Sequence, residues 1–327
     1  MKMHLEADRA MRTTELVILN YNGRRHLEAL LPTALAEANA YPGDCRVVVI
    51  DNRSTDSDAD WINRQFPEVG VWIAPENEFL FSYNTYAARS KAAILVFLNN
   101  DLKLLQGFVQ PLVQPFAEDD VFAVSATSRD WQSREFTFGP TRLSCHHGDY
   151  FWLPEYGRQE YSHTLFTSGG FMAVDRLKFL ELGGFDRLYH PAYCEDLDLC
   201  FRAWRNGWRC LFQPLSVVLH REHGSWKNKS GNPTQRLMLR NKFLFVWSSL
   251  PKGAGTLERA TYLIIKAFRK FSKGIRWELS TFLHALRDWR VVCKKNKYFQ
   301  ASHFELNAIN VKINSTPQLP VKSQPMS

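Results

Sequence analysis

The stretch AAILVFLNNDL, residues 92–102, decides the fold class of this chain. Its first seven residues are six aliphatic side chains and Phe97, and the polar residues Asn99, Asn100 and Asp101 follow directly. An apolar run without alternation is typical of a strand buried on both faces of a parallel sheet. Because a core cannot use two amides and a carboxylate, we expect this strand to end at the edge of the core.

Two more apolar runs end in the same way, ELVILN at 15–20 and RVVVID at 46–51. Together with the segments between them they form an alternation of strands and helices, predicted at 15–20, 23–40, 46–51, 57–66, 69–74, 82–92 and 93–101. Pro32 is expected to interrupt or kink the first helix. The alternation predicts an α/β fold, in which a parallel sheet is covered by helices on both faces.

The three strand ends, LNYN, IDNRSTD and LNND, each present Asn or Asp. Ligands of parallel sheets bind outside the carboxyl ends of the strands. Asn and Asp are also ordinary turn residues, so one such ending would indicate only a turn. Three similar endings favour a shared polar rim that binds a ligand.

The second half is more mixed, with strands predicted at 121–126, 170–174 and 210–219. Between the last two strands, apolar residues at positions 197, 200, 201 and 204 occupy one face of a helix. Gly207 follows at a place where the C-terminus of a helix favours glycine. The pattern predicts a helix from about Glu195 to Asn206.

Three acidic residues, Glu195, Asp196 and Asp198, stand at the start of this helix among Cys194 and Leu197. Acidic residues in a first turn are favoured by the helix macrodipole. Carboxylates in an apolar neighbourhood also acquire raised pKa values and can act as general bases. The residues alone leave both explanations open.

The rim carries no glycine-rich phosphate loop of the G-x-G-x-x-G or G-K-[ST] kind. A bound diphosphate would then need a divalent cation, and Mg²⁺ or Mn²⁺ prefers carboxylate and phosphate oxygens. Asp101, at the tip of a buried strand, is placed to hold such an ion. His220 ends the apolar run SVVLH and is a second candidate ligand, although a lone histidine after a strand is more often structural.

Charge divides the chain. Residues 1–226 carry 22 Lys and Arg against 29 Asp and Glu, whereas residues 227–297 carry 17 against 3. From 256 to 290 apolar residues recur at steps of three and four among lysines and arginines. This stripe fits a helix at a membrane interface, attracted by anionic lipid, and it fits equally a helix packed on protein. No recognition motif supports nucleic acid as a partner.

Other features place the chain in the cytoplasm. The first thirteen residues have no apolar centre, so we expect a polar leader and not a signal peptide. No apolar run approaches the length of a membrane span. The six cysteines are scattered and are predicted to be reduced, and Cys145-His146-His147 lacks a second ligand pair with zinc spacing.

Six segments in order carry a resemblance to a known family: VILNYNG, VVVIDNRSTD, VFLNNDL, SGGFMAVDR, LGGFDRLYHPAYCEDLDLCFRAWRNGW and SVVLHREHGSW. Together they resemble the bacterial glycosyltransferase family 2 enzymes, with the rhamnosyltransferase-like branch of cell-surface polysaccharide assembly most similar. The resemblance covers residues 14–226. It implies a GT-A fold with a nucleotide-sugar half at 14–102 and an acceptor half at 103–226. A basic amphipathic helical region at 227–300 and a disordered tail at 301–327 are expected to follow.

The resemblance also implies roles for individual residues. Donor nucleotide contacts fall on Asn20, Tyr21, Asp51, Asn52, Asn84, Asn99 and Asn100. Asp101 and His220 take the places of metal ligands, and Asp196, beside Glu195, takes that of the catalytic base. Ser168, Gly169 and Gly170 match a loop near the acceptor, although Gly169 and Gly170 would serve a simple turn equally well.

Two departures from the family pattern affect the donor site. Asn99 replaces the first aspartate of the metal motif, which predicts weaker metal affinity without the donor diphosphate. Glu78 and Leu80 stand where the family often has small residues, so the donor pocket is expected to differ in shape.

The expected function is inverting transfer of a sugar from a nucleotide-diphosphate donor to a saccharide, or a lipid-linked saccharide, in surface polysaccharide or O-antigen assembly. Residues 256–297 would then bind the inner face of the bacterial cytoplasmic membrane. Two alternatives stay open: a nucleotidyltransferase that makes a sugar donor, which lacks support because NYNGRRHL is a poor version of its glycine-rich basic loop, and a non-catalytic sugar-binding relative.

Overall fold

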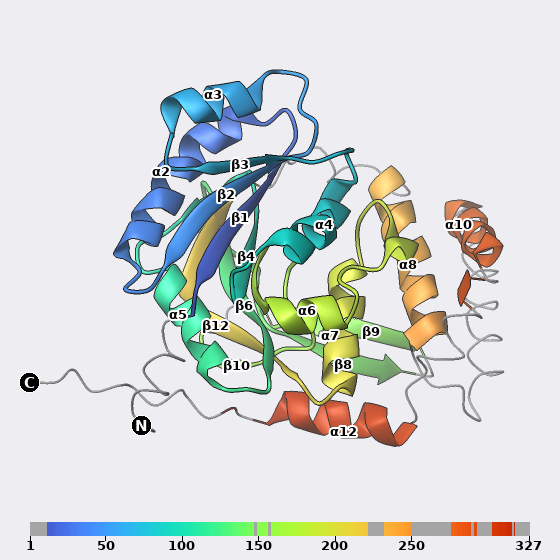
Figure 1. Ribbon diagram of the computed structural model, residues 1–327. Helices are drawn as coiled ribbons and strands as arrows, with labels where there is room; N and C mark the ends of the chain where they lie inside the picture. Colours follow the sequence, from blue (N-terminus) through green and yellow to red (C-terminus); the bar gives the residue numbers. More distant parts are fainter. Residues whose placement is uncertain are drawn as a thin grey trace, which may run out of the picture.

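A computed structural model describes residues 12–146, 149–155, 158–221, 232–249, 276–288, 291–292, 303–315 and 317. Figure 1 shows a twisted central sheet with helices on both faces, and further helices from the end of the chain on its outer side. The described residues form a ten-stranded sheet and a separate two-stranded one. The α/β prediction is confirmed.

The main sheet has the order β10-β12-β6-β11-β4-β1-β2-β3, with β5 paired to β12 and β7 to β6. Its strands are β1 (Thr14–Asn20), β2 (Cys45–Asp51), β3 (Gly70–Ile73), β4 (Ile94–Asn99), β5 (Leu102–Leu104), β6 (Val121–Asp130), β7 (Phe136–Phe138), β10 (Ser162–His163), β11 (Phe171–Asp175) and β12 (Arg209–His220). The second sheet pairs β8 (Thr141–His146) with β9 (Asp149–Pro154).

The four strands predicted in the first half are parallel neighbours, in the order β4-β1-β2-β3. Antiparallel β11 lies between β4 and β6 and joins the two halves of the sheet. Because β4, β1 and β2 are parallel neighbours, their carboxyl ends lie side by side.

Alternate residues of these strands bury against opposite layers of helices. Leu16 and Ile18 pack in one apolar cluster with α2, whereas Val17 and Phe97 pack in the other with α4, α6 and α7. The helices are α2 (Arg24–Ala40), α3 (Asp58–Gln65), η1 (Phe79–Phe81), α4 (Ser82–Arg89), α5 (Val109–Val113), η2 (Gln114–Ala117), α6 (Arg176–Glu181), η3 (Arg187–Tyr189) and α7 (Glu195–Arg205). Contrary to one expectation, Pro32 does not interrupt α2, which continues through it to Ala40.

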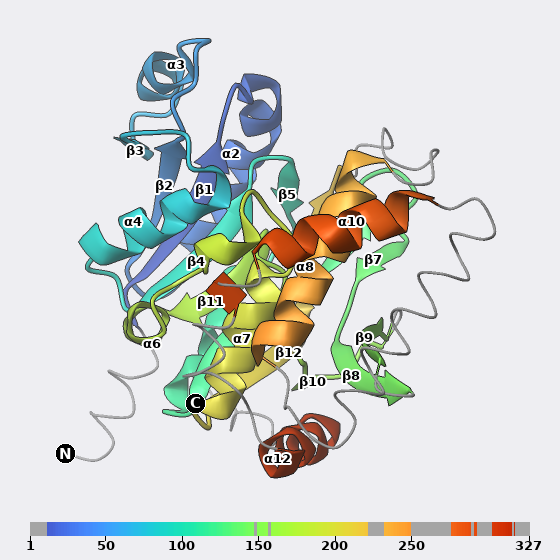
Figure 2. The same ribbon diagram turned by 90° about the vertical axis from the view of Figure 1, so that its right-hand side faces the viewer.

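Helices α8 (Pro233–Ser249) and α10 (Arg276–Arg287) follow the predicted catalytic region; α8 packs on its α7 and η3, and α10 packs on α8 (Figure 2). Phe282 of α10 meets Phe243 and Trp247 of α8 edge to face, while Leu283 and Leu286 are exposed. Part of the basic stripe therefore packs on protein. Residues 256–275 and 289–290 of the stripe, and 293–297 after it, lie outside the described residues. No described helix is long and apolar enough to cross a membrane.

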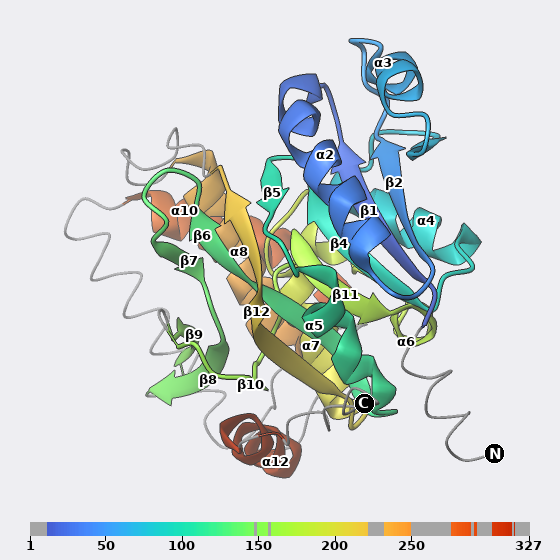
Figure 3. The same ribbon diagram turned by 90° about the vertical axis from the view of Figure 1, so that its left-hand side faces the viewer.

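Helix α12 (His303–Asn314) corrects the expectation of a disordered tail for residues 303–315. Ile309 and Ile313, one turn apart, are buried in the main apolar cluster. His163 Nδ1 lies 3.0 Å from the Ser315 carbonyl at the end of the helix. Figure 3 shows α12 below β8 and β10, and this short apolar face explains why a polar tail folds there.

Candidate active site

The polar rim predicted from the three strand ends is present. Backbone register places Asn20 beside Asp51 and Leu19 beside Asn99. The side chain of Asn100 donates a hydrogen bond of 2.8 Å to Asn20 Oδ1. Parallel pairing thus brings residues from three distant segments to one edge of the sheet.

Sequence reasoning missed the residue that ties this edge together, Asp58 at the start of α3. Its carboxylate is fully buried and accepts hydrogen bonds from Asn20 Nδ2 at 2.7 Å and Gly23 N at 2.9 Å. Arg24 Nε lies 3.3 Å from the other carboxylate oxygen. In the sequence, the only indication of this role was an aspartate in the first turn of a helix. Such residues are common at exposed helix ends, so the position did not stand out.

Asp51 and Asn52, the predicted donor contacts after β2, are buried. Asp51 accepts a hydrogen bond from Ser54 N at 2.7 Å. Asn52 Nδ2 donates to Asn77 Oδ1 at 2.8 Å and to the Phe79 carbonyl at 3.0 Å. These bonds position the 77–81 segment that departs from the family pattern, next to the rim.

Tyr21 and Asn84 occupy different settings. The Tyr21 side chain is half exposed at the end of β1. Asn84 exchanges two hydrogen bonds of 2.8 Å with the backbone of Phe185, one donated and one accepted. A Cβ on Gly184 would lie 2.4 Å from Asn84 Oδ1, so glycine lets this turn close on the amide. Asn84 therefore supports the 184–185 turn.

The two predicted metal ligands lie together. Strand β5 pairs with β12, and this pairing brings Asp101 Oδ1 within 3.3 Å of His220 Nε2. Asp101 Oδ1 is buried and accepts no hydrogen bond within the described part of the chain. A carboxylate oxygen and an imidazole nitrogen facing each other fit a shared divalent cation. The described residues contain no cluster of three or more His, Cys, Asp or Glu side chains.

Three consecutive residues connect this pair with the predicted base. Gly169 N donates to Asp196 Oδ2 at 3.3 Å, the Gly170 carbonyl accepts from Asn99 N at 2.8 Å, and the Phe171 ring meets the His220 ring edge to face. A Cβ on Gly170 would come within 2.5 Å of the Asn99 amide. Segment 169–171 therefore brings the end of β4 and the start of α7 to one place.

Within that segment Gly170 is closely packed, whereas a Cβ on Gly169 would meet its nearest neighbours at an ordinary 3.7 Å. Neither Gly169 nor Gly170 has a positive φ, so neither is required by a left-handed turn. Ser168 Oγ accepts a hydrogen bond of 3.4 Å from Gly170 N. Residues 168–171 form a turn that is closed by a hydrogen bond of 3.2 Å from Phe171 N to the Ser168 carbonyl, and the Asn99 amide leaves no room for a Cβ on Gly170. The role of this segment as an acceptor loop stays a prediction.

The acidic pair at the start of α7, Glu195 and Asp196, has raised pKa values. Burial raises the pKa of Asp196 to about 6, against opposing hydrogen bonds from Leu197 N and Gly169 N. Burial, followed by the nearby charge of Asp196, raises the pKa of Glu195 well above its usual value. The two groups titrate as a pair, and burial makes this pair hold protons more readily than two ordinary carboxyl groups would.

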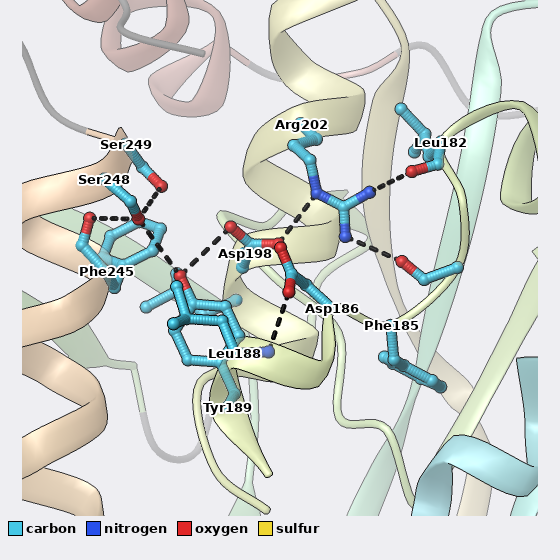
Figure 4. A network of polar contacts seen from close by, with 12 residues as sticks. Leu182, Phe185, Asp186, Leu188, Tyr189, Asp198, Arg202, Phe245, Ser248 and Ser249 are labelled. Carbon is cyan, nitrogen blue, oxygen red and sulfur yellow. Dashed lines mark hydrogen bonds and ion pairs between the residues drawn. The ribbon is translucent and has the colours of Figure 1, made fainter. Parts of the chain in front are cut away.

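Asp198, the third acidic residue, has a structural role that Figure 4 shows. Its buried carboxylate pairs with Arg202 Nε at 2.8 Å and accepts a hydrogen bond from the Tyr189 hydroxyl at 3.2 Å. Arg202 also donates to the carbonyls of Leu182 and Gly184, at 2.6 and 2.8 Å. This network fixes the chain that leads into Glu195 and Asp196.

Comparison with known proteins identifies the class. The family described as "Glycosyltransferase like family 2" matches residues 12–240, so the chain belongs to this family. The match ends inside α8. The rhamnosyltransferase-like branch stays a prediction.

Among curated proteins, the chain is 24% identical over 232 residues to "Polypeptide N-acetylgalactosaminyltransferase 6" of Mus musculus, covering 64% of this chain and 37% of that protein. It is 23% identical over 235 residues to "Putative polypeptide N-acetylgalactosaminyltransferase 10" of Drosophila melanogaster, covering 66% and 37%. The chain thus spans little more than a third of the length of these relatives.

Two solved structures support the fold. GalNAc-T7 with UDP, GalNAc and Mn²⁺ superposes with a TM-score of 0.57 at 19% identity, over 83% of this chain and 58% of that chain. TarS of S. aureus superposes with a TM-score of 0.50 at 12% identity, over 71% and 39%. The GT-A fold is confirmed.

Proposed function

We propose that this protein is an inverting glycosyltransferase that moves a sugar from a nucleotide-diphosphate donor to a saccharide acceptor. The single observation that carries the proposal is the contact of segment 169–171 with three groups: Asn99 beside the metal-ligand position, His220, and Asp196. The candidate metal ligands and the candidate general base would then lie on two sides of one short loop, as a displacement between two substrates requires.

The donor nucleotide would lie along the rim. Asn20, Asp51, Asn52 and Asn100 line it, and Tyr21 offers an exposed ring for contact with the base. Asn99 would face the diphosphate, and Asn84 would act indirectly by holding the 184–185 turn. The related GalNAc-T7 structure contains UDP, which supports a nucleotide donor without identifying the one used here.

A divalent cation, Mg²⁺ or Mn²⁺, would be held by Asp101 and His220 together with the donor. It would supply positive charge for the departing nucleoside diphosphate. Because Asn99 contributes no charge, the donor oxygens would have to complete the site. The Mn²⁺ of the GalNAc-T7 structure supports this choice of ion.

Asp196 would act as the general base. As the acceptor oxygen forms a bond to the anomeric carbon, its proton passes to the Asp196 carboxylate and the bond from that carbon to the diphosphate breaks. One displacement of this kind inverts the anomeric centre. A pKa of about 6 suits the role, since the group is ionised at neutral pH yet more basic than an ordinary aspartate.

The acceptor in this proposal is a saccharide, or a lipid-linked saccharide, of a bacterial surface polysaccharide such as O-antigen. The excess of basic residues at 227–297 and the exposed Leu283 and Leu286 of α10 would bind the cytoplasmic face of the membrane. Recovery of the full chain with anionic vesicles, compared with a variant lacking 256–297, tests this part. Equal recovery of both would contradict it.

A thermal-shift panel of UDP-, dTDP- and GDP-sugars, each with and without Mn²⁺, tests the function. We expect stabilisation by one nucleotide class and dependence on the ion. A nucleotidyltransferase would instead bind a nucleoside triphosphate with a sugar phosphate, so the panel also includes these two ligands together. A non-catalytic relative would bind the donor and release no nucleotide when candidate acceptors are added.

A further inference from the structure

Asn241, in the middle of α8, lies under the chain that leads to the acidic pair. Its side chain is fully buried. Its amide nitrogen lies 3.0, 2.8 and 2.9 Å from the carbonyl oxygens of Tyr189, Ala192 and Tyr193. Because the amide has two N–H bonds, one of them is shared between two of these acceptors. One side chain from a later helix thereby holds both ends of the 189–193 loop.

The loop that Asn241 holds is strained. Tyr193 and Cys194 are consecutive residues with φ of 74° and 69°, and neither is a glycine. Left-handed conformations cost free energy for such residues and persist only where the surroundings impose them. Cys194 caps α7, and Glu195 and Asp196 follow at once. The strained turn therefore decides where the two carboxyl groups point.

Asn241 is itself held from the far side. Arg240 Nη1 donates to Asn241 Oδ1 at 2.6 Å, and Arg240 Nη2 pairs with Asp288 Oδ2 at 2.7 Å. Asp288 follows directly after α10. A continuous set of polar contacts thus runs from the end of α10, through α8, to the turn before Asp196.

We propose that Asn241 is a positioning residue for the Glu195–Asp196 pair, and that the Arg240–Asp288 ion pair holds it in place. It acts through the Tyr193–Cys194 turn and touches neither substrate. The inference rests on the proposed function for its kinetic consequences, but the effect on the turn is independent of any activity. If Asn241 has this role, α8 and the residue that follows α10 belong to the catalytic unit.

The test compares Asn241→Leu, which keeps the approximate size and loses the donor, with Leu244→Ala one turn along α8. Leu244 is fully buried in the core and makes none of the polar contacts to the loop described here. Both variants are expected to lower the melting temperature of the full chain. Only Asn241→Leu should expose the buried Cys194 thiol to iodoacetamide, measured by mass spectrometry of the labelled peptide.

In kinetics with the donor found by thermal shift, Asn241→Leu should lower kcat about 10–100-fold at unchanged donor KM, because small misplacements of catalytic groups cost rate of this order. In this variant the pH at which kcat/KM falls on the acid side should also change, since the environment of Asp196 changes. Asp288→Asn should give a smaller loss in the same direction.

Three outcomes would overturn the inference: Cys194 stays protected in Asn241→Leu, Leu244→Ala loses as much kcat as Asn241→Leu, or the pH profile does not move. Failure of the proposed function is distinguishable, because the wild-type chain would then transfer no sugar while the labelling difference at Cys194 persisted.

Discussion

Replacing Asp196 by asparagine is expected to abolish sugar transfer and to stabilise the folded protein. The base is lost because an amide cannot take the acceptor proton. Stability rises because the wild-type protein keeps a carboxylate in a poorly solvated place, as its raised pKa shows. Catalytic groups commonly carry such a cost in stability.

The magnitude follows from the pKa. The folded value of about 6 against an ordinary 3.8 is a difference of about two units, and each unit corresponds to about 1.4 kcal/mol. Asparagine keeps one of the two backbone hydrogen bonds that the carboxylate accepts, from Leu197 N and Gly169 N, and losing the other costs about 1 kcal/mol. The net gain at pH 8 is then about 2 kcal/mol.

The gain depends on pH with a defined sign. Because the folded pKa lies above the unfolded one, the wild-type free energy of unfolding falls as pH rises from about 4 to about 6. The Asp196→Asn variant escapes this loss, so it should be more stable than wild type at pH 8 and no more stable at about pH 4.5. Wild-type kcat/KM should fall as pH drops below about 6, as the base becomes protonated.

Urea unfolding of both proteins at about pH 4.5 and pH 8 measures this difference. Asp60→Asn, at an exposed position of α3, is the control that removes one charge without a buried carboxylate. Its stability should stay within about 0.5 kcal/mol of wild type at both values of pH. If the Asp196→Asn variant were destabilised equally at both values of pH, the raised pKa of Asp196 would be refuted. If the variant turned over normally, the assignment of Asp196 as the base would be refuted.

Three further changes test other parts of the site. Asp101→Asn should remove the Mn²⁺ dependence of the thermal shift caused by the donor, measured by titrating the ion; an unchanged ion dependence would exclude Asp101 as a ligand. Gly170→Ala should lower kcat at least about 10-fold, because its methyl group meets the Asn99 amide at 2.5 Å; wild-type turnover would show that segment 169–171 can shift without consequence. Ending the chain at residue 302 should lower the melting temperature by several degrees, since α12 buries Ile309; an unchanged melting temperature would mean that α12 adds nothing to stability.

The sequence by itself determined the four parallel strands of the first half, the polar rim and the helix that carries the acidic pair. Continuous apolar runs such as 94–98 specify buried strands locally, and their polar ends lie at one edge because parallel pairing leaves no other arrangement. The helix from Glu195 was equally local, since its apolar residues repeat with the period of one face. The family resemblance added the pairing of Asp101 with His220, which the structure places 3.3 Å apart.

Only the tertiary structure decided which distant groups support the site. Asp58 and Asn241 look unremarkable in sequence, yet the first joins Asn20 across 38 residues and the second joins Tyr193 across 48. Residues 303–314 of the tail were misjudged for the same reason, because the two isoleucines of α12 gain stability only on a surface made by other segments. The spacing of apolar residues indicates which face of a segment is buried. The hydrogen-bond partners of a residue depend instead on which segments the folded chain brings next to it.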